Sequence, residues 1–392
     1  MSILATFLAS SPEMNAAEWS GEVAAEATLF TESAQFSDQE ENLNLAVSAQ
    51  PEFYHSWDNR NQSFEFVPFV RVDKHDTERT HVDIRELAWT GVYDHWEVRA
   101  GISRVFWGVA EFQHLVDVIN QVDLVENIDG EDRLGQPMLL LTSIRDWGSV
   151  ELFLLPYFRE RTFAGEEGRL RSPFVVDNER AEYESSAEAA HVDVALRYEH
   201  YVGDWDFSLS HFSGTNREPL LTPFIEADGS ARLAPFYQQM EQTAVTLQAT
   251  KGRTLWKLEA LHRVTSLEVH NAIASGVEYS FFGIADTSLD LGLLLEYHYD
   301  DRGENAPTVF EDDIAIGGRL AFNDTQTTEL LAGAVMDQST GGVFFSLEGS
   351  RRLTNQLLLN IESRIFFNQD EEDIAFSLDQ DDYFRVNLSF NF

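Results

Sequence analysis

The sequence predicts an all-β fold: a single transmembrane antiparallel β-barrel of about 18 strands, with 16 as the alternative count. Three observations lead to this prediction. Apolar and polar residues alternate along most of the chain, the alternating runs are long, and the connections between them are alternately short and long. Strict alternation is typical of antiparallel strands that have one apolar and one polar face.

The alternation is clearest in "SLDLGLLLEYHYD", residues 288–300. Apolar side chains occupy every second position from Leu289 to Tyr299, whereas Asp290 and Glu296 lie on the opposite face. Such runs have about 10 to 13 residues, close to the roughly 9 to 11 that a tilted strand needs to cross a bilayer. Strands of soluble proteins usually have about 5 to 6, so the length favours a membrane barrel.

We expect strands at about 20–30, 44–54, 63–73, 80–91, 95–105, 137–146, 149–159, 188–201, 204–213, 236–250, 253–264, 271–282, 286–299, 313–323, 326–337, 342–352, 356–367 and 382–392. Short turns join them at 93–95, 146–148, 202–204, 251–253, 283–285, 323–325 and 354–355. Longer, acidic loops lie at about 31–43, 106–136, 159–187, 213–235, 300–312 and 368–380. This asymmetry is typical of outer-membrane barrels, in which the short turns are periplasmic and the long loops extracellular.

The last ten residues, "YFRVNLSFNF", alternate without a break and end on Phe392. A final strand that pairs with the first would close the barrel and leave no free edge. The stretch resembles the C-terminal signature of bacterial outer-membrane β-barrel proteins, a last amphipathic strand that ends in Phe with an aromatic near its start, here Tyr383. The resemblance implies that the barrel-insertion machinery is a partner. The alternative is the last strand of a soluble β-domain.

Residues 104–158 carry a second pattern: Arg104 before Trp107-Gly108, an Asp-x-Ile-Asn-x-x-Asp stretch at 117–123, and a strand that ends on Leu-Pro-Tyr-Phe at 155–158. The pattern resembles a porin-like family of bacterial outer-membrane proteins of largely uncharacterised function. That resemblance implies a pore in the bacterial outer membrane, without naming a solute.

Composition excludes several classes of function. The formal net charge of -40 argues against nucleic-acid binding, which needs basic patches, and the absence of cysteine excludes disulfides and thiolate sites. No GxSxG, P-loop or GxGxxG motif is present, so we predict no enzyme and no cofactor. An enzyme could only be assembled from His211 with Ser208 and Ser210, or from His262.

Metal binding is also poorly supported, because no HExxH or comparable pair occurs. The acidic clusters at 300–301, 311–313 and 371–373 fit solvated charge better than calcium sites. We predict no metal. Residues 1–17 contain an apolar run at 3–9 that no Lys or Arg precedes, so they are either a truncated signal peptide or a disordered N-terminus. The barrel is expected to occupy 18–392.

Charged rings on the inner wall set the selectivity of pores. The predicted pore-lining residues are Arg71, Arg85, Arg99, Arg145, Arg159, Arg197, Arg263, Arg319, Arg352, Arg364 and Arg385, most of them at polar-face positions. The competing interpretation is that they pair with inner-wall acids such as Glu259, Glu296 and Glu362 and only hold the wall together.

The segment 106–136 is the predicted constriction, with Glu111, Asp117 and Asp123 as its charged residues. A connection this long in a compact fold is usually functional or disordered. Its apolar residues Phe112, Leu115, Val116 and Ile119 recur at spacings of three and four, which suggests a helix. The segment either folds into the barrel, opposite wall arginines, or remains an external loop.

The predicted outward residues include Val277, Tyr279, Phe281, Trp256, Leu258 and Ala260, and the predicted aromatic girdles comprise Trp89, Trp96, Trp107, Trp205, Tyr299 and Tyr383. We therefore expect an outer-membrane channel in contact with lipid, through which small polar or charged solutes diffuse. The alternatives are a selective channel for an anionic substrate or polymer, a non-conducting structural or adhesive barrel, and a soluble secreted β-protein.

Overall fold

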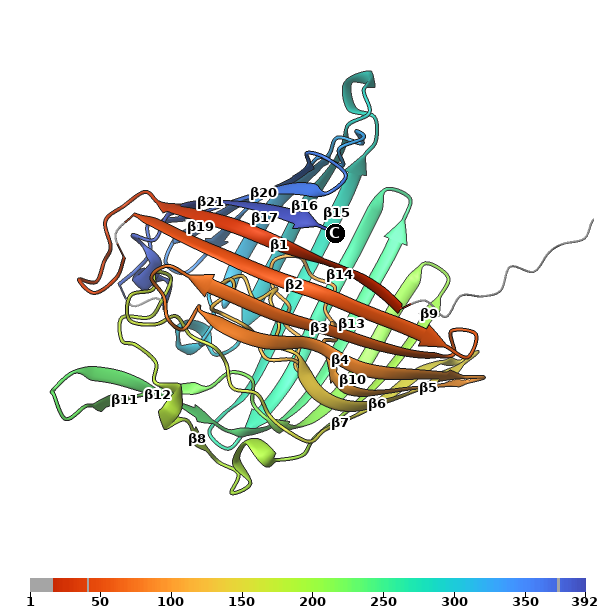
Figure 1. Ribbon diagram of the computed structural model, residues 1–392, viewed down its shortest axis with the longest axis horizontal. Coiled ribbons are helices and arrows are strands. Elements are labelled where there is room, and N and C mark those ends of the chain that lie inside the picture. The colour runs from red at the N-terminus through yellow and green to blue at the C-terminus, as the bar shows by residue number, and fades with distance from the viewer. Residues whose placement is uncertain (1–16, 41, 372–373) are drawn as a thin grey trace, which may run out of the picture.

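Eighteen strands form one closed, antiparallel barrel (Figure 1). This computed structural model describes residues 17–40, 42–371 and 374–392, so most of the predicted leader at 1–17 lies outside the described residues. The predicted fold class is confirmed, with the higher of the two strand counts. Among the described residues, no helix has the length and apolar composition that crossing a membrane requires.

The barrel strands, in order, are β1 (Ala17–Phe30), β2 (Leu43–Trp57), β3 (Gln62–Asp73), β4 (His81–Tyr93), β5 (Trp96–Ser103), β6 (Gln136–Arg145), β7 (Gly148–Leu155), β9 (Asp193–Val202), β10 (Trp205–Thr215), β13 (Gln239–Lys251), β14 (Thr254–Thr265), β15 (Val269–Phe281), β16 (Asp290–Asp300), β17 (Asp312–Ala321), β18 (Glu329–Asp337), β19 (Val343–Arg352), β20 (Leu357–Phe367) and β21 (Tyr383–Asn391).

The first and last strands close the ring. β1 pairs with β2 on one side and with β21 on the other, from Glu22 opposite Asn391 to Phe30 opposite Tyr383. Figure 1 shows β21 lying beside β1. The final strand therefore does pair with the first, and closure leaves the sheet without an edge that could pair with another chain.

A small second sheet lies outside the barrel and was not predicted. β11 (Leu220–Ile225) and β12 (Ala231–Tyr237) form a hairpin, and β12 also pairs in parallel with β8 (Glu182–Tyr183). In Figure 1 this hairpin extends away from the barrel at the loop end. Its first strand, "LLTPFI", has no polar–apolar alternation, so the criterion that located the barrel strands could not detect it.

The two faces of the wall differ as the alternation predicts. Exposed apolar residues such as Leu209, Ile273 and Leu295 lie on the outer face. At the short-turn end of that face lies a girdle of exposed rings: Trp19, Trp96, Trp147, Trp205, Trp256, Tyr279, Phe281, Phe390 and Phe392. This pairing of an apolar band with an aromatic rim matches the outside of a membrane barrel.

Two of the predicted girdle residues are wrong. Trp107 and Tyr383 are only 4% and 1% exposed and lie inside the barrel. Tyr383 is paired with inward-facing Phe30 at the loop end of β21, and its ring lies 5.9 Å from that of Phe30. Trp107 follows β5 and packs against Phe153 on the inner wall.

The hydrophobic core lies inside the ring rather than between two layers. It joins Trp107, Val116 and Ile119, from the connection after β5, to inner-face residues of β6, β7 and β10 such as Phe153 and Phe212. The inner wall is therefore apolar on this side and charged elsewhere, so the lumen is partly filled with packed side chains.

Substitution on the outer face should reveal how deeply each position is embedded. Leu295→Arg, at the middle of β16, should destabilise the barrel in lipid vesicles by about 2–4 kcal/mol, because arginine at the bilayer midplane costs that much. Leu291→Arg, nearer the end of the same face, should cost about 1 kcal/mol or less. Denaturant unfolding followed by tryptophan fluorescence measures both, and equal costs would contradict the predicted depth of β16.

Candidate functional site

The connection between β5 and β6, residues 104–135, folds into the barrel and packs on the inner wall; we call it the inserted segment. It contains no helix, so the predicted helical conformation is wrong. Val116 and Ile119 are buried, at 1% and 2% exposure, because they belong to the hydrophobic cluster on the inner wall. Bridges such as Val122 to Arg133 fold the segment back on itself.

The Asp-x-Ile-Asn-x-x-Asp stretch fixes the shape of the inserted segment from within. The Asn120 amide donates to the carbonyls of Ser103 and Leu134, both at 2.9 Å, and accepts from the N–H of Val105 at 2.9 Å. One side chain thus ties together the two ends of the segment. Asp117 accepts from the N–H of Trp107 at 2.6 Å, which fixes the first turn.

Two wall carboxylates anchor the first half of the segment through its main chain. The carboxylate of Glu259 on β14 accepts hydrogen bonds from the N–H groups of Val109, Ala110 and Val116. The bonds from Ala110 and Val116 are 2.8 and 3.1 Å long. Glu296 on β16 accepts in the same way from the N–H groups of Glu111 and Phe112, at 2.8 and 3.1 Å. Both acids were expected to pair with arginines, and inner-face alternation alone could not reveal that they bind backbone.

Phe112 lies against a flat part of the wall made by Gly317 of β17 and Gly333 of β18. A Cβ atom at Gly333 would lie 2.6 Å from the Phe112 ring, and one at Gly317 would lie 3.0 Å from it. These glycines therefore leave the space that the ring fills. The signal in the sequence was a glycine in each of two neighbouring strands, but only the register shows that they lie side by side.

Arginines of the wall hold the second half of the segment. Arg71 on β3 forms a charge-assisted pair with Glu126 at 2.6 Å and also contacts Glu26 of β1 at 3.2 Å. Arg85 on β4 binds Asp123 at 2.6 Å. These groups are almost completely buried, where removing one partner of an ion pair typically costs about 3–5 kcal/mol.

A β-bulge places two consecutive residues of β4, Arg85 and Glu86, on the inner face. The register between β3 and β4 shifts at Val67 and Pro68, so the consecutive residues Arg85 and Glu86 are both buried inside the barrel. A bulge adds a residue to one strand and re-aims its side chains. Arg85 points at the inserted segment as its alternation with Asp83 predicts, and the bulge brings Glu86 to the same inner face, where strict alternation would not have placed it.

The other predicted pore-lining arginines fall into three groups. Arg364 pairs with Asp129 and Glu348, Arg385 with Glu362, Arg159 with Asp83, Arg197 with Glu151 and Glu199, Arg263 with Glu218, and Arg319 with Glu111. Arg99 donates to Thr90, and Arg352 is exposed at the short-turn end of β19. The prediction that Arg145 lines the pore is wrong. Its register position matches that of outward residues, so it lies on the outer face of β6. There its guanidinium carbon lies 5.3 Å from the centroid of the Trp96 ring.

The predicted constriction acids occupy different environments. Glu111 lies between Lys257, at 3.3 Å, and Arg319, and its side chain retains 21% exposure. Asp117 and Asp123 are 6% and 0% exposed in their ion pairs with Arg133 and Arg85. Of the three side chains, that of Glu111 therefore has the greatest exposure.

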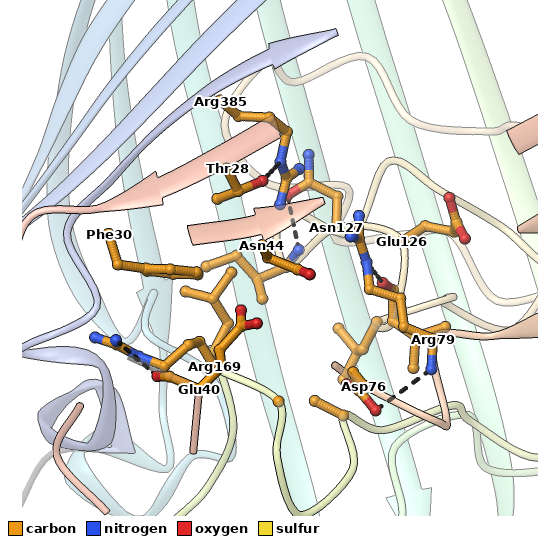
Figure 2. Close-up of a pocket in the computed structure, with 16 residues that line it drawn as sticks. Thr28, Phe30, Glu40, Asn44, Asp76, Arg79, Glu126, Asn127, Arg169 and Arg385 are labelled. Carbon is orange, nitrogen blue, oxygen red and sulfur yellow. Dashed lines mark hydrogen bonds between the residues drawn. The ribbon is translucent and has the colours of Figure 1, made fainter. Parts of the chain in front are cut away.

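Figure 2 shows where the tip of the inserted segment, at Glu126 and Asn127, meets the wall and the long loop that carries Arg169. A cavity of about 40 Å³ lies there between Thr28, Asn127 and Arg169. Arg169 joins two other loops beside this cavity, a set of contacts that we call the Arg169 clasp. It forms an ion pair with Asp381 at 2.5 Å and donates a hydrogen bond to the carbonyl of Glu40 at 3.4 Å. The loop end is therefore closed on this side by linked loops.

Two larger cavities lie on the short-turn side of the inserted segment. One, of about 380 Å³, separates Asp129 and Asp132 from the wall at Glu329 and Glu348. The other, of about 370 Å³, lies between Glu111 and the wall at Gln248. Glu131 lines both cavities.

One cluster could in principle hold a metal: His81, Asp123 and Glu126 bring ligand atoms within 4.8 Å of one another. Both carboxylates are already neutralised by Arg85 and Arg71. The arrangement is that of an ion-pair network.

The structure does not bring together the catalytic candidates His211, Ser208 and Ser210. His211 lies on the outer face of β10, whereas Ser208 and Ser210 are buried on its inner face.

No family model matches the sequence, and no curated protein matches it. Among solved structures, the fold is similar to that of a mutant of the Rh. blastica porin, with 10% identity, a TM-score of 0.46, and coverage of 96% of this chain and 100% of that one. It is also similar to OmpT, an outer membrane protein of Vibrio cholerae in trimer form, with 10% identity, a TM-score of 0.46, and coverage of 96% and 99%.

The backbone anchors can be tested by hydrogen exchange. Glu259→Gln should speed exchange of the Val109, Ala110 and Val116 amides by at least about tenfold, because an amide oxygen accepts less strongly than a charged carboxylate. Glu278→Gln is the matched control, since Glu278 faces inward on β15 but accepts none of these N–H groups. Equal exchange in both variants would show that the carboxylate does not hold the segment.

A buried carboxyl in the inserted segment should make stability depend on pH. Burial and the carboxylates of Glu126 and Asp129 raise the pKa of Asp132 to about 7. The folded protein therefore retains a proton that the unfolded chain loses at lower pH, so stability falls as pH rises from about 4 to 7. Asp132→Asn should raise the melting temperature most at pH 8 and least near pH 4.

The control for that experiment is Asp94→Asn, which changes a turn carboxylate that is 92% exposed. Its melting temperature should follow that of the parent at both pH values. A gain for Asp132→Asn that is the same at pH 4 and pH 8 would contradict the assignment.

Proposed function

We propose that this protein is a channel in the outer membrane of a Gram-negative bacterium and that small polar or charged solutes diffuse through it. The observation that carries the proposal is a closed barrel of 18 strands with an apolar outer face, a charged inner face and a long segment folded inside. Barrels of 16 to 18 strands enclose an aqueous channel, which such a segment would narrow.

The outer face supports the membrane location. Closed barrels satisfy every strand's backbone without water, and so are one of the two structures that can cross a bilayer. The exposed apolar band and the girdle of rings at the short-turn end match the hydrocarbon region and its interface with water. The outer-membrane lipid is thus a partner, and the strand that ends in Phe392 would be the element recognised by the insertion machinery.

The inserted segment is the proposed constriction, and Glu111 is its solute-facing charge. Glu111 on the segment faces Lys257 of β14 and Arg319 of β17, so opposite charges border the lumen at that height. Asp117 and Asp123 act instead as buried supports, since they have almost no exposure. The segment would therefore set both the width of the lumen and its local field.

A non-conducting structural or adhesive barrel is the second candidate, and one observation favours it. The hydrophobic core fills one side of the lumen, and the Arg169 clasp closes part of the loop end. A selective channel for an anionic polymer is less favoured, because most of the predicted arginines are engaged by carboxylates.

Conductance in planar bilayers tests the proposal. Refolded protein should give discrete current steps in symmetric KCl, and deletion of residues 108–134 should increase the step size severalfold, because the lumen loses its filling. The double variant Glu259→Gln, Glu296→Gln keeps the chain intact and should make the steps noisier by freeing the segment. Folded, inserted protein without any steps would favour the non-conducting barrel.

A further inference from the structure

We propose that the channel selects cations and cationic solutes, and that Asp132 and Glu329 are the residues that set this preference. The inference rests on the proposed channel function and adds a substrate class to it. The preference depends on which charged groups face the cavities and which are paired with groups that hold the inserted segment in place.

The cavity of about 380 Å³, which we call the larger cavity, has a strong excess of negative charge. Its lining contains the carboxylates of Asp129, Glu131, Asp132, Glu329, Glu348 and Glu362 and only two guanidinium groups, those of Arg319 and Arg385. The acids come from both sides, three from the inserted segment and three from the wall strands β18, β19 and β20. A solute that crosses this space therefore passes between two negatively charged surfaces.

The nearby arginines are already paired. Arg385 contacts Glu362 and Glu26, and Arg319 contacts Glu111. Arg364 is shared between Asp129, Glu348 and Glu362, so one positive charge faces three carboxylates. The positive charge of the inner wall thus stabilises the fold, and little of it is left to attract an anion.

Two of the acids have no ion pair among the described residues: Asp132 on the inserted segment and Glu329 at the start of β18. Glu131, with 57% side-chain exposure, forms an ion pair with His114. Asp132 and Glu329 therefore present unpaired carboxylates to the cavity, and rings of acidic side chains favour cations in channels.

The second cavity differs from the first in its charge. It is bordered by Glu111 and Glu131 and by the basic residues Lys257 and His114. Each of these acids contacts one of the bases, so this part is close to neutral. The negative excess is consequently concentrated at the larger cavity, on the short-turn side of the constriction.

The cation preference should weaken at low pH. Asp132 is faced by Glu126, Asp129 and Asp123 of its own segment and by Arg85 of the wall, and burial together with the first two raises its pKa to about 7. At pH 8 it is charged and attracts cations, whereas at pH 6 most copies are protonated and neutral.

Reversal potentials across a tenfold KCl gradient test the inference. We expect a K⁺ to Cl⁻ permeability ratio above one at pH 8, a lower ratio at pH 6, and a fall of at least about twofold in the double variant Asp132→Asn, Glu329→Gln. The control removes two carboxylates far from the cavity, with Glu179→Gln and Asp228→Asn, and should leave the ratio unchanged. Heat-dependent gel mobility confirms that each variant is folded.

The outcomes separate the two proposals. Conducting protein with a ratio at or below one, or a ratio that the double variant does not lower, overturns the selectivity inference and leaves the channel standing. Equal effects of the cavity variant and the control would assign selectivity to overall surface charge and also overturn it. Folded, inserted protein that never conducts overturns the channel itself.

Discussion

The organisation of the interior depends on one constraint: a charge buried inside the barrel is costly unless it meets an opposite charge or a set of hydrogen-bond donors. Burying an unpaired charge costs several kcal/mol, which is comparable with the whole stability of many domains. Arg71 between Glu26 and Glu126 is the clearest case, because it joins β1, β3 and the inserted segment through groups that are almost completely buried. The position of the segment follows from such contacts.

The two halves of the inserted segment meet this constraint differently. The first half gives its main-chain N–H groups to Glu259 and Glu296, whereas the second half gives its own carboxylates to Arg71 and Arg85. The wall therefore uses acids for one half and bases for the other. Since the arginines are occupied in this way, the carboxylates that remain determine the charge of the open space.

Much of the barrel could be predicted from the sequence because alternation is a local property that each strand repeats. Strand positions such as β16 and β21 came within a few residues of those in the structure, but β11 did not, since it lacks alternation. The interior was harder. Alternation did place Arg85 on the inner face, but register decides that Arg145 faces outward, and the bulge at Val67 decides that Glu86 faces inward beside Arg85. Neither of these two positions is visible in a pattern of period two. The binding of backbone by Glu259 depends on a fold of the inserted segment that no local pattern encodes.

The anchors on Glu259 and Glu296 have an evolutionary consequence. They recognise N–H groups, which every residue except proline carries, so they do not constrain the side chains at Val109, Ala110 and Glu111. Drift at these positions can alter what faces the lumen while the attachment persists. The scaffold thus separates the part of the segment that must be inherited from the part that selection is free to vary, and related chains could acquire new permeants by single substitutions there.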